Sequence, residues 1–266
     1  MKDISKHLRR LVVEAIDGGG RGHLGSSVSP LEIIYTVYDS FLNITLENVT
    51  SLDRDRFILS KGHGCLALYA VLAHKGFIKR EELKTFCKHD SRLGGHPERN
   101  NIPGVEASTG ALGHGLSIGV GMALAARIQK RKSKVVVLTG DGEINEGSVW
   151  EAAMSASKHK LSNLTVMVDY NKLQSYGTTK EVLDLEPLVD KWTSFGFHTI
   201  EVDGHNMKEL VETYKKIPLR PDKPTAIICH TIKGKGFPFA EGNPHWHHKS
   251  KLSPKELADL YACVEE

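Results

Sequence analysis

VVVLTGDGEINEG (residues 135–147) places an aspartate between two glycines at the end of an apolar run. The run predicts a strand buried on both faces, as the strands of parallel sheets are. In open α/β sheets, ligands bind beyond the carboxyl ends of the strands. The two glycines let Asp141 approach a ligand closely, because neither neighbour carries a side chain. Taken alone, the stretch favours a plain turn in which Asp141 caps the following helix.

A second stretch, VDYNKLQS (residues 168–175), ends the next apolar strand with Asn171. If the two strands are neighbours, Asp141 and Asn171 face each other across one crevice. A carboxylate, an amide oxygen and a backbone carbonyl form the hard oxygen set that Mg²⁺ prefers. The glycines and the start of the following helix offer N–H groups for a diphosphate. The pair of stretches therefore predicts a metal–diphosphate site.

Apolar strands alternate with helices along the chain, most clearly in its second half. This pattern predicts an α/β fold: a parallel sheet with helices on both faces, in a single domain over residues 1–266. Ser29 and Pro30 are typical of an N-cap and a first helical position, so a helix is expected to begin there. The other predicted helices are 4–16 (ended by the glycines 18–20), 65–74, 112–129, 146–159, 187–195, 207–215 and 253–263, and the strands are 56–59, 134–139, 164–169, 198–202 and 225–230.

Composition excludes several classes of protein. The chain has 266 residues, is 40% hydrophobic and carries a formal charge of +3, with no basic stripe of the kind that binds nucleic acid. No apolar run approaches the ~18–20 residues that span a bilayer, and no signal peptide follows the charged N-terminus. Four cysteines form no CxxC pair, which favours reduced packing residues in a cytoplasmic protein: Cys65, Cys87, Cys229 and Cys263.

One glycine pattern suggests a different class. GRGHLG (residues 20–25) fits G-x-G-x-x-G, but a dinucleotide site needs a strand before this pattern and a helix directly after it. A helix precedes it here, so we set aside a nicotinamide-dependent oxidoreductase. His23, held between Gly22 and Leu24 in a flexible turn, is the residue of interest in this stretch.

The stretches at 135–147 and 168–175 resemble the thiamine diphosphate motif, a GDG followed some tens of residues later by an asparagine. Further stretches resemble those of the transketolases in the same order and cover nearly the whole chain. They are SKGHG at 60–64, GGHPE at 94–98, GVEASTGALGHG at 104–115, DGH at 203–205 and TIKGKG at 231–236. The resemblance implies the thiamine diphosphate-binding fold.

The resemblance also implies a cofactor and its ligands. Asp141, the side chain of Asn171 and the carbonyl of Leu173 would bind Mg²⁺, for which Ca²⁺ or Mn²⁺ are substitutes. The residues of the family motifs that would contact thiamine diphosphate, at its diphosphate or at its aminopyrimidine, are His63, Gly110, Ala111, Leu112, Gly142, Asn171 and His247.

By the same resemblance, His23, His63, His96 and His247 would act near the reacting carbons. Histidine suits proton transfer near neutral pH because its unperturbed pKa is about 6.5. His247 is preferred over His245 and His248 because it follows a tryptophan, as in some family members. Glu146 matches a family glutamate at the subunit interface. Four other histidines lack such context and are expected to be ordinary: His7, His74, His89 and His159.

Three positions depart from the family pattern. Ala111 stands where proline is common, His114 where glutamine is common, and His248 where glycine is usual. The first two lie beside the segment expected at the pyrimidine, so they would change detail there without preventing cofactor binding.

The chain is less than half as long as transketolase subunits, whose second domain supplies an acid that acts on the cofactor. We therefore expect a second polypeptide, joined with this one in an α₂β₂ assembly, and weak cofactor binding without turnover by this chain alone. The initial methionine and the helical end favour a split subunit over a truncated one.

The leading prediction is thus the cofactor-binding subunit of a two-chain transketolase that moves a two-carbon ketol unit between sugar phosphates. The near alternative is the same type of subunit with a branched or sulfonated ketose as its substrate, or in a deoxyxylulose phosphate synthase-like enzyme. A non-catalytic scaffold on this fold is the alternative from another class. The set of Asp141, Asn171, His23, His63 and His96 argues against the scaffold.

Overall fold

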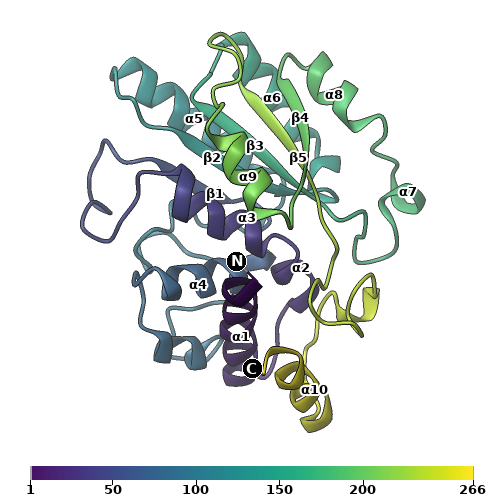
Figure 1. Cartoon of the computed structure of the whole chain (residues 1–266). Helices are drawn as coiled ribbons and strands as arrows, with labels where there is room; N and C mark the ends of the chain where they lie inside the picture. Colours follow the sequence, from purple (N-terminus) through teal and green to yellow (C-terminus); the bar gives the residue numbers. More distant parts are fainter. Residues whose placement is uncertain (1, 266) are drawn as a thin grey trace.

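A computed structural model describes residues 2–265, and Figure 1 shows their arrangement. Five strands form a single sheet in the order β1-β2-β3-β5-β4, and every neighbouring pair is parallel. The predicted parallel α/β sheet is therefore confirmed, and so is the adjacency of the strands that end in Asp141 and Asn171. The strands are β1 (Arg56–Leu59), β2 (Val135–Gly140), β3 (Leu164–Tyr170), β4 (His198–Asp203) and β5 (Thr225–His230).

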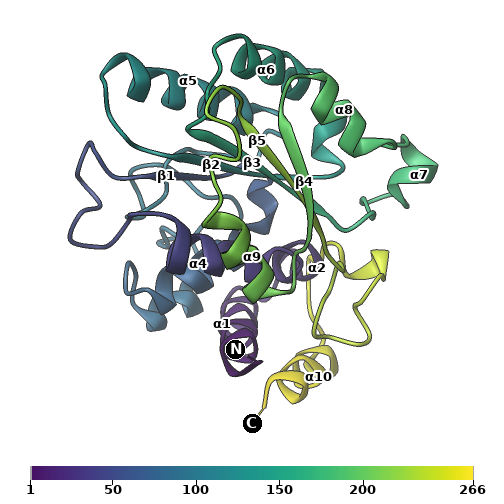
Figure 2. The same ribbon diagram turned by 45° about the horizontal axis from the view of Figure 1, so that its top comes forward.

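Helices cover both faces of the sheet, as Figure 2 shows. One face carries α5 (His114–Ile128), α6 (Gly147–Lys158) and α8 (Leu188–Ser194), and the other carries α1 (Lys2–Gly19), α3 (Leu31–Thr36), α4 (Cys65–His74) and α9 (Met207–Tyr214). Strand side chains alternate between the two layers: Val136 and Leu138 join the core on the α1 side, and Val135 and Val137 join the core on the α5 side.

Helix α5 packs on the sheet through small residues. A Cβ added at Gly119 would overlap the Val137 side chain, and one added at Gly115 would overlap Ser60. These close contacts explain why a helix rich in Gly and Ala lies here. They also bring the amino end of α5 over the carboxyl ends of β1 and β2.

The start of the second helical region differs from the prediction. A short helix, α2 (Leu24–Val28), begins directly after His23, and Pro30 rather than Ser29 is the N-cap of α3. The Ser29 hydroxyl donates instead to the buried Asp169 carboxylate at 2.6 Å, so it does not cap a helix. The expected flexible turn around His23 is therefore the entry to a buried helix.

The remaining elements are a C-terminal helix, one short helix and several short turns. The chain ends with α10 (Pro254–Val264), capped by Ser253 and lying beside α1 (Figure 1). The sequence did not indicate α7 (Thr179–Val182), the π turn at Val37–Phe41 or the 3₁₀ turns at Gly62–Gly64, Arg80–Thr85, Glu143–Asn145 and Pro244–Trp246. Within residues 2–265, no helix has both the length and the apolar character needed to cross a membrane.

Candidate active site

A cavity of about 270 Å³ opens at the carboxyl ends of β2 and β3. Its walls come from loops that are far apart in the sequence but follow neighbouring strands. It is lined by Ser26, Lys61, His63, Leu112, Gly140, Asp141, Gly142, Glu143, Glu146, Asn171, Leu173, Gln174, Ser175, Tyr176, Lys233 and His247.

Asp141 lies in the wall of this cavity and is only 3% exposed. Its carboxylate accepts the N–H of Gly142 at 2.7 Å and the N–H of Lys172, beyond the neighbouring strand, at 2.5 Å. Burial, together with the nearby charge of Asp169, raises the pKa of Asp141 to about 6. Asp141 does not cap the following helix, since Glu146 is the N-cap of α6 and the Asp141 carboxylate accepts from the Gly142 and Lys172 backbones instead.

The two other predicted metal ligands lie across from Asp141. The Asn171 side-chain oxygen accepts the Leu173 N–H at 3.1 Å, while its amide nitrogen donates to Asp169 at 3.2 Å. The Leu173 carbonyl accepts a hydrogen bond from the Lys233 ammonium at 2.6 Å. The Lys233 ammonium thus contacts one of the oxygens that the family resemblance assigns to Mg²⁺.

A buried ion pair lies beneath the cavity. The Lys61 ammonium contacts the Asp169 carboxylate at 2.5 Å, and the two side chains are 2% and 0% exposed. Hydroxyls of Ser29 and Thr231 also donate to Asp169, at 2.6 and 2.5 Å. Although burial opposes ionisation, the charge of Lys61 and these donors hold the pKa of Asp169 below its usual value.

The donor set fits a magnesium ion. Asp141, Asn171 and the Leu173 carbonyl supply one carboxylate, one amide and one backbone oxygen, which is the chemistry Mg²⁺ takes when phosphate and water complete its octahedron. Among the described residues, no group of three or more His, Cys, Asp or Glu side chains could hold a metal. The proposed set is not such a group, because it contains a single side-chain carboxylate.

The cavity also suits a diphosphate. The Gln174 amide nitrogen is buried without a hydrogen-bond partner among residues 2–265, and Lys61 and Lys233 bring two ammonium groups. A Cβ added at Gly142 would lie 2.9 Å from side-chain atoms of Gln174, so any side chain at this position would overlap Gln174 in the cavity wall. The Gly142 N–H itself is engaged by Asp141, not directed outward as the sequence suggested.

His63 and His247 line the cavity, and His23 lies against both of them behind its wall. The ring centroid of His23 lies 5.5 Å from that of His63 and 5.7 Å from that of His247, and the latter two are 5.7 Å apart. Burial and the neighbouring cations lower the pKa of His23 to about 4 and that of His247 to about 3, and that of His63 well below its usual value. All three are therefore neutral at pH 7.

His247 is held on both sides. Its Nδ1 lies 3.5 Å from the Ser26 hydroxyl and its Nε2 lies 3.0 Å from the Ser175 hydroxyl. The alternatives differ: His245 is exposed, and His248 is exposed but lies against His23 with ring centroids 4.3 Å apart. Of the three, only His247 lines the cavity.

The glycine-rich segment before α5 reaches the cavity only at Leu112. His96 is exposed, and its ring would lie 2.7 Å from a Cβ added at Gly110, which has a φ of +138°. Leu112 and Glu146 line the cavity, whereas Gly110, Ala111 and His96 lie outside its walls. The departure from the family at His114 leaves an exposed ring whose Nδ1 contacts the Leu112 carbonyl at 3.1 Å.

Sequence reasoning missed several residues of the site. Glu143 is 2% exposed and accepts the N–H groups of Gly113 and Gly140 at 3.0 Å, with the Ser60 hydroxyl as a third donor; burial raises its pKa. Lys61 belongs to the SKGHG motif and Lys233 to the TIKGKG motif, so these two family motifs could have indicated both lysines as site residues. The residues missed are Ser26, Lys61, Gly140, Glu143, Gln174, Ser175, Tyr176 and Lys233 in the cavity wall, and Asp169 beneath it.

These features define a parallel α/β domain with a cavity suited to a metal-bound diphosphate. Residues 1–262 match the family described as transketolase, thiamine diphosphate binding domain. The chain therefore belongs to the transketolase family, and it corresponds to that family's thiamine diphosphate-binding domain.

Individual relatives agree with this assignment. The chain is 44% identical to one subunit of the apulose-4-phosphate transketolase from Phocaeicola vulgatus, over 92% of this chain and 86% of the relative. It is 42% identical to a 6-deoxy-6-sulfo-D-fructose transketolase subunit of a Clostridium species, over 97% and 94%. A solved Pichia stipitis transketolase mutant superposes with a TM-score of 0.89 at 30% identity, over 99% of this chain and 40% of that one. The chain thus spans about two fifths of that solved transketolase.

The histidine cluster predicts an acid-sensitive fold. The unfolded chain binds protons at His23, His63 and His247 below pH ~6.5, whereas the folded chain does not until about pH 4 or lower at His23 and His247. Their stabilising contribution is therefore complete above pH ~6.5 and is lost as pH falls toward 4. The raised pKa of Asp141 has the opposite effect on the free energy of unfolding between about pH 4 and 6. It concerns a single group, whereas three histidines contribute to the loss of stability.

Urea unfolding of the apo chain at stepped pH checks this expectation. We expect the double variant His23→Gln/His247→Gln to reduce the slope of the unfolding free energy against pH, by an amount that corresponds to up to about two bound protons. The exposed His245→Gln serves as the matched control and leaves the slope unchanged. An identical slope in the double variant would contradict the assigned pKa directions.

Proposed function

We propose that this chain is the Mg²⁺–thiamine diphosphate-binding subunit of a two-chain transketolase, which transfers a two-carbon ketol unit from a ketose to an aldose. The observation that carries the proposal is the meeting of Asp141, Asn171 and the Leu173 carbonyl with two lysines in one cavity at the ends of β2 and β3. We propose further that residues 1–266 act as one domain.

Within this proposal, Asp141, Asn171 and the Leu173 carbonyl hold the metal. Its arrival would take Leu173 from the Lys233 ammonium, which then faces the diphosphate together with Lys61. Both lysines are 4% or less exposed, so each interacts strongly with phosphate because little water screens it. The free Gln174 amide supplies a hydrogen bond to a phosphate oxygen.

Thiamine diphosphate supplies the carbon chemistry of bond cleavage and formation. The chain's own contribution is to place proton carriers beside the reacting sugar. His23, His63 and His247 are neutral at pH 7, so each presents a ring nitrogen that can accept a hydrogen bond from a sugar hydroxyl. Their lowered pKa makes each a weak base, and a bound diphosphate, which offsets the lysine charges, would raise that pKa toward the range suited to proton transfer. We assign His96 to the same group at the outer rim. The segment 110–112 offers backbone groups to the aminopyrimidine.

A partner polypeptide completes the site. Helix α5 exposes a face of small and apolar residues, including Ile118 at 36% and Ile128 at 73% exposed, and Met154 of the adjacent α6 is 56% exposed. This face begins near the cavity rim, where Tyr176 is 93% exposed and Glu146 lies at the start of α6. We propose that the second chain covers it, in an α₂β₂ assembly, with Glu146 at the interface.

Two observations bear on the alternatives. Relatives over most of this chain's length are named for apulose 4-phosphate and 6-deoxy-6-sulfofructose, which favours a branched or sulfonated ketose as the donor. A scaffold role fits poorly, because a carboxylate as buried as Asp141, with a raised pKa, costs stability in the apo chain and is typical of functional sites.

Co-expression with the polypeptide encoded next to this chain tests the proposal. We expect ketol transfer that requires both chains, thiamine diphosphate and Mg²⁺, on xylulose 5-phosphate, apulose 4-phosphate or 6-deoxy-6-sulfofructose as donor. Asp141→Ala should abolish turnover and cofactor binding, because the metal loses its carboxylate. Asp190→Ala, at an exposed acid on α8, is the matched control.

The outcomes separate the alternatives. Turnover on one unusual donor alone would fix the substrate class, whereas turnover by this chain free of any partner would refute the two-chain proposal. Unchanged cofactor affinity in Asp141→Ala would refute the metal site.

The partner surface makes a separate prediction. Ile118→Glu places a charge on the exposed face of α5, so we expect partner affinity to fall at least roughly tenfold, a loss on the order of 1.4 kcal/mol. Leu46→Glu, at a 48% exposed position in the loop before β1, is the control. Calorimetric titration of one chain with the other measures both. Equal affinities for the two variants would place the interface elsewhere.

A further inference from the structure

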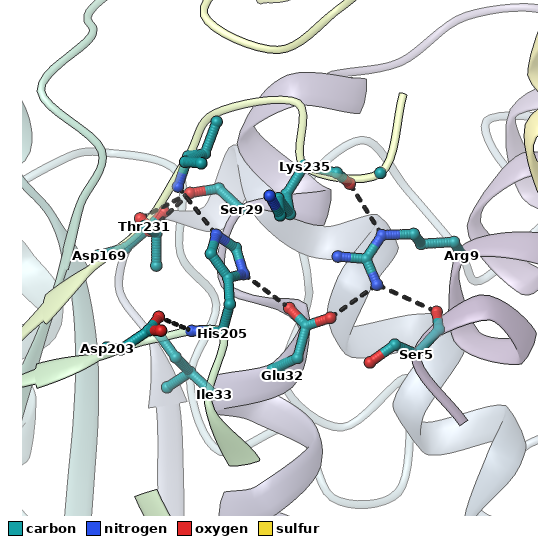
Figure 3. A network of polar contacts seen from close by, with 12 residues as sticks. Ser5, Arg9, Ser29, Glu32, Ile33, Asp169, Asp203, His205, Thr231 and Lys235 are labelled. Carbon is teal, nitrogen blue, oxygen red and sulfur yellow. Dashed lines mark hydrogen bonds and ion pairs between the residues drawn. The ribbon is translucent and has the colours of Figure 1, made fainter. Parts of the chain in front are cut away.

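Two quoted motifs, DGH and TIKGKG, meet in a buried polar network that lies outside the cavity walls (Figure 3). Three side chains carry it: Arg9 from α1, Glu32 from α3 and His205 from the loop after β4. Arg9 donates to Glu32 at 2.6 Å, and His205 Nδ1 lies 3.0 Å from the other Glu32 oxygen. Arg9 and Glu32 are 6% and 3% exposed.

His205 has one defined tautomer in this network. Its Nε2 accepts the backbone N–H of Ile232 at 2.9 Å, and a backbone N–H can only donate. The proton therefore resides on Nδ1, which donates it to Glu32. The backbone of His205 is fixed in turn, because its own N–H donates to the Asp203 side chain at 2.9 Å.

Arg9 reaches the same loop at a second point. Its Nε donates to the Lys235 carbonyl at 2.8 Å. Gly236, the next residue, has a φ of +91°, and a Cβ there would overlap the Arg9 guanidinium. The second glycine of TIKGKG is thus required by the close approach of this arginine.

The two anchored peptide groups flank the cavity lysine. Ile232 comes directly before Lys233, and Lys235 comes two residues after it. Lys233 is 4% exposed, and its ammonium donates to the Leu173 carbonyl. Glu32 remains charged between the two anchors: burial opposes ionisation, but the His205 hydrogen bond and the charge of Arg9 bring its pKa down to about 2.

We propose that Arg9, Glu32 and His205 form a positioning unit that sets the place of the Lys233 ammonium in the cavity by holding Ile232 and Lys235. None of the three lines the cavity, so their effect on a ligand passes through Lys233. That the ligand is a metal-bound diphosphate rests on the proposed function; that the unit holds the loop does not.

Paired substitutions of His205 separate its two hydrogen bonds. The His205→Asn amide can still donate to Glu32 but places no atom where Nε2 was, whereas the His205→Gln amide can reach the Ile232 N–H. We expect His205→Asn to weaken thiamine diphosphate affinity in the presence of Mg²⁺ roughly tenfold or more. Substitution of residues that orient the groups of a binding site typically has an effect of this size. We expect His205→Gln to stay within about threefold of the wild type.

A double-mutant cycle tests whether the effect passes through Lys233. In a Lys233→Met background, we expect His205→Asn to change the affinity by less than about twofold, since the group that it positions is gone. An equal loss in both backgrounds would overturn the proposal and leave only a general structural role. His230→Asn, which breaks an exposed His–Glu pair on the adjoining strand β5, is the matched control.

Hydrogen exchange tests the positioning without any cofactor. In the complete chain, as it is purified, His205→Asn should speed amide exchange over residues 232–236, and His205→Gln and His230→Asn should not. Unchanged exchange in His205→Asn would overturn the proposal. Absence of thiamine diphosphate binding by the wild-type chain together with its partner polypeptide would instead refute the proposed function, with the exchange result still deciding whether the unit holds the loop.

Discussion

The Lys61–Asp169 ion pair is the interaction on which the candidate site depends. Both side chains are nearly or wholly buried, and removing one partner would leave an uncompensated charge in the interior, which costs roughly 3–5 kcal/mol. The hydroxyls of Ser29 and Thr231 complete the shell around Asp169. The pair therefore joins the loop after β1, strand β3, the α2–α3 corner and the loop after β5 directly under the cavity.

This pair also governs the electrostatics above it. The Asp169 charge helps to raise the pKa of Asp141, while the lysines help to keep the cavity histidines neutral. A bound divalent cation would relieve the first effect, because it supplies the positive charge that Asp141 lacks. A diphosphate would in turn offset Lys61 and Lys233. Because Lys61 already pairs with Asp169, Asp141 and Lys233 are the two charged groups left to interact with a metal and an anion.

The sequence predicted the layers and the strand ends well, because apolar periodicity and glycine placement are local. Asp141 and Asn171 were paired correctly since consecutive strands of such sheets are often neighbours. Helix α2 was not predicted, because five buried residues show no period. The role of Ser29 was wrong since its partner Asp169 lies 140 positions away. Lys233 and Glu143 depend likewise on contacts between distant loops, which no local pattern reveals.

A crystal structure of the chain with thiamine diphosphate and Mn²⁺ in place of Mg²⁺ tests the metal site directly, through the anomalous signal of the metal. We expect one strong peak within coordination distance of the Asp141 carboxylate, the Asn171 side-chain oxygen and the Leu173 carbonyl, with phosphate oxygens on its open side and Lys233 withdrawn from Leu173. A peak elsewhere, or ordered cofactor with no metal between Asp141 and Asn171, would contradict it.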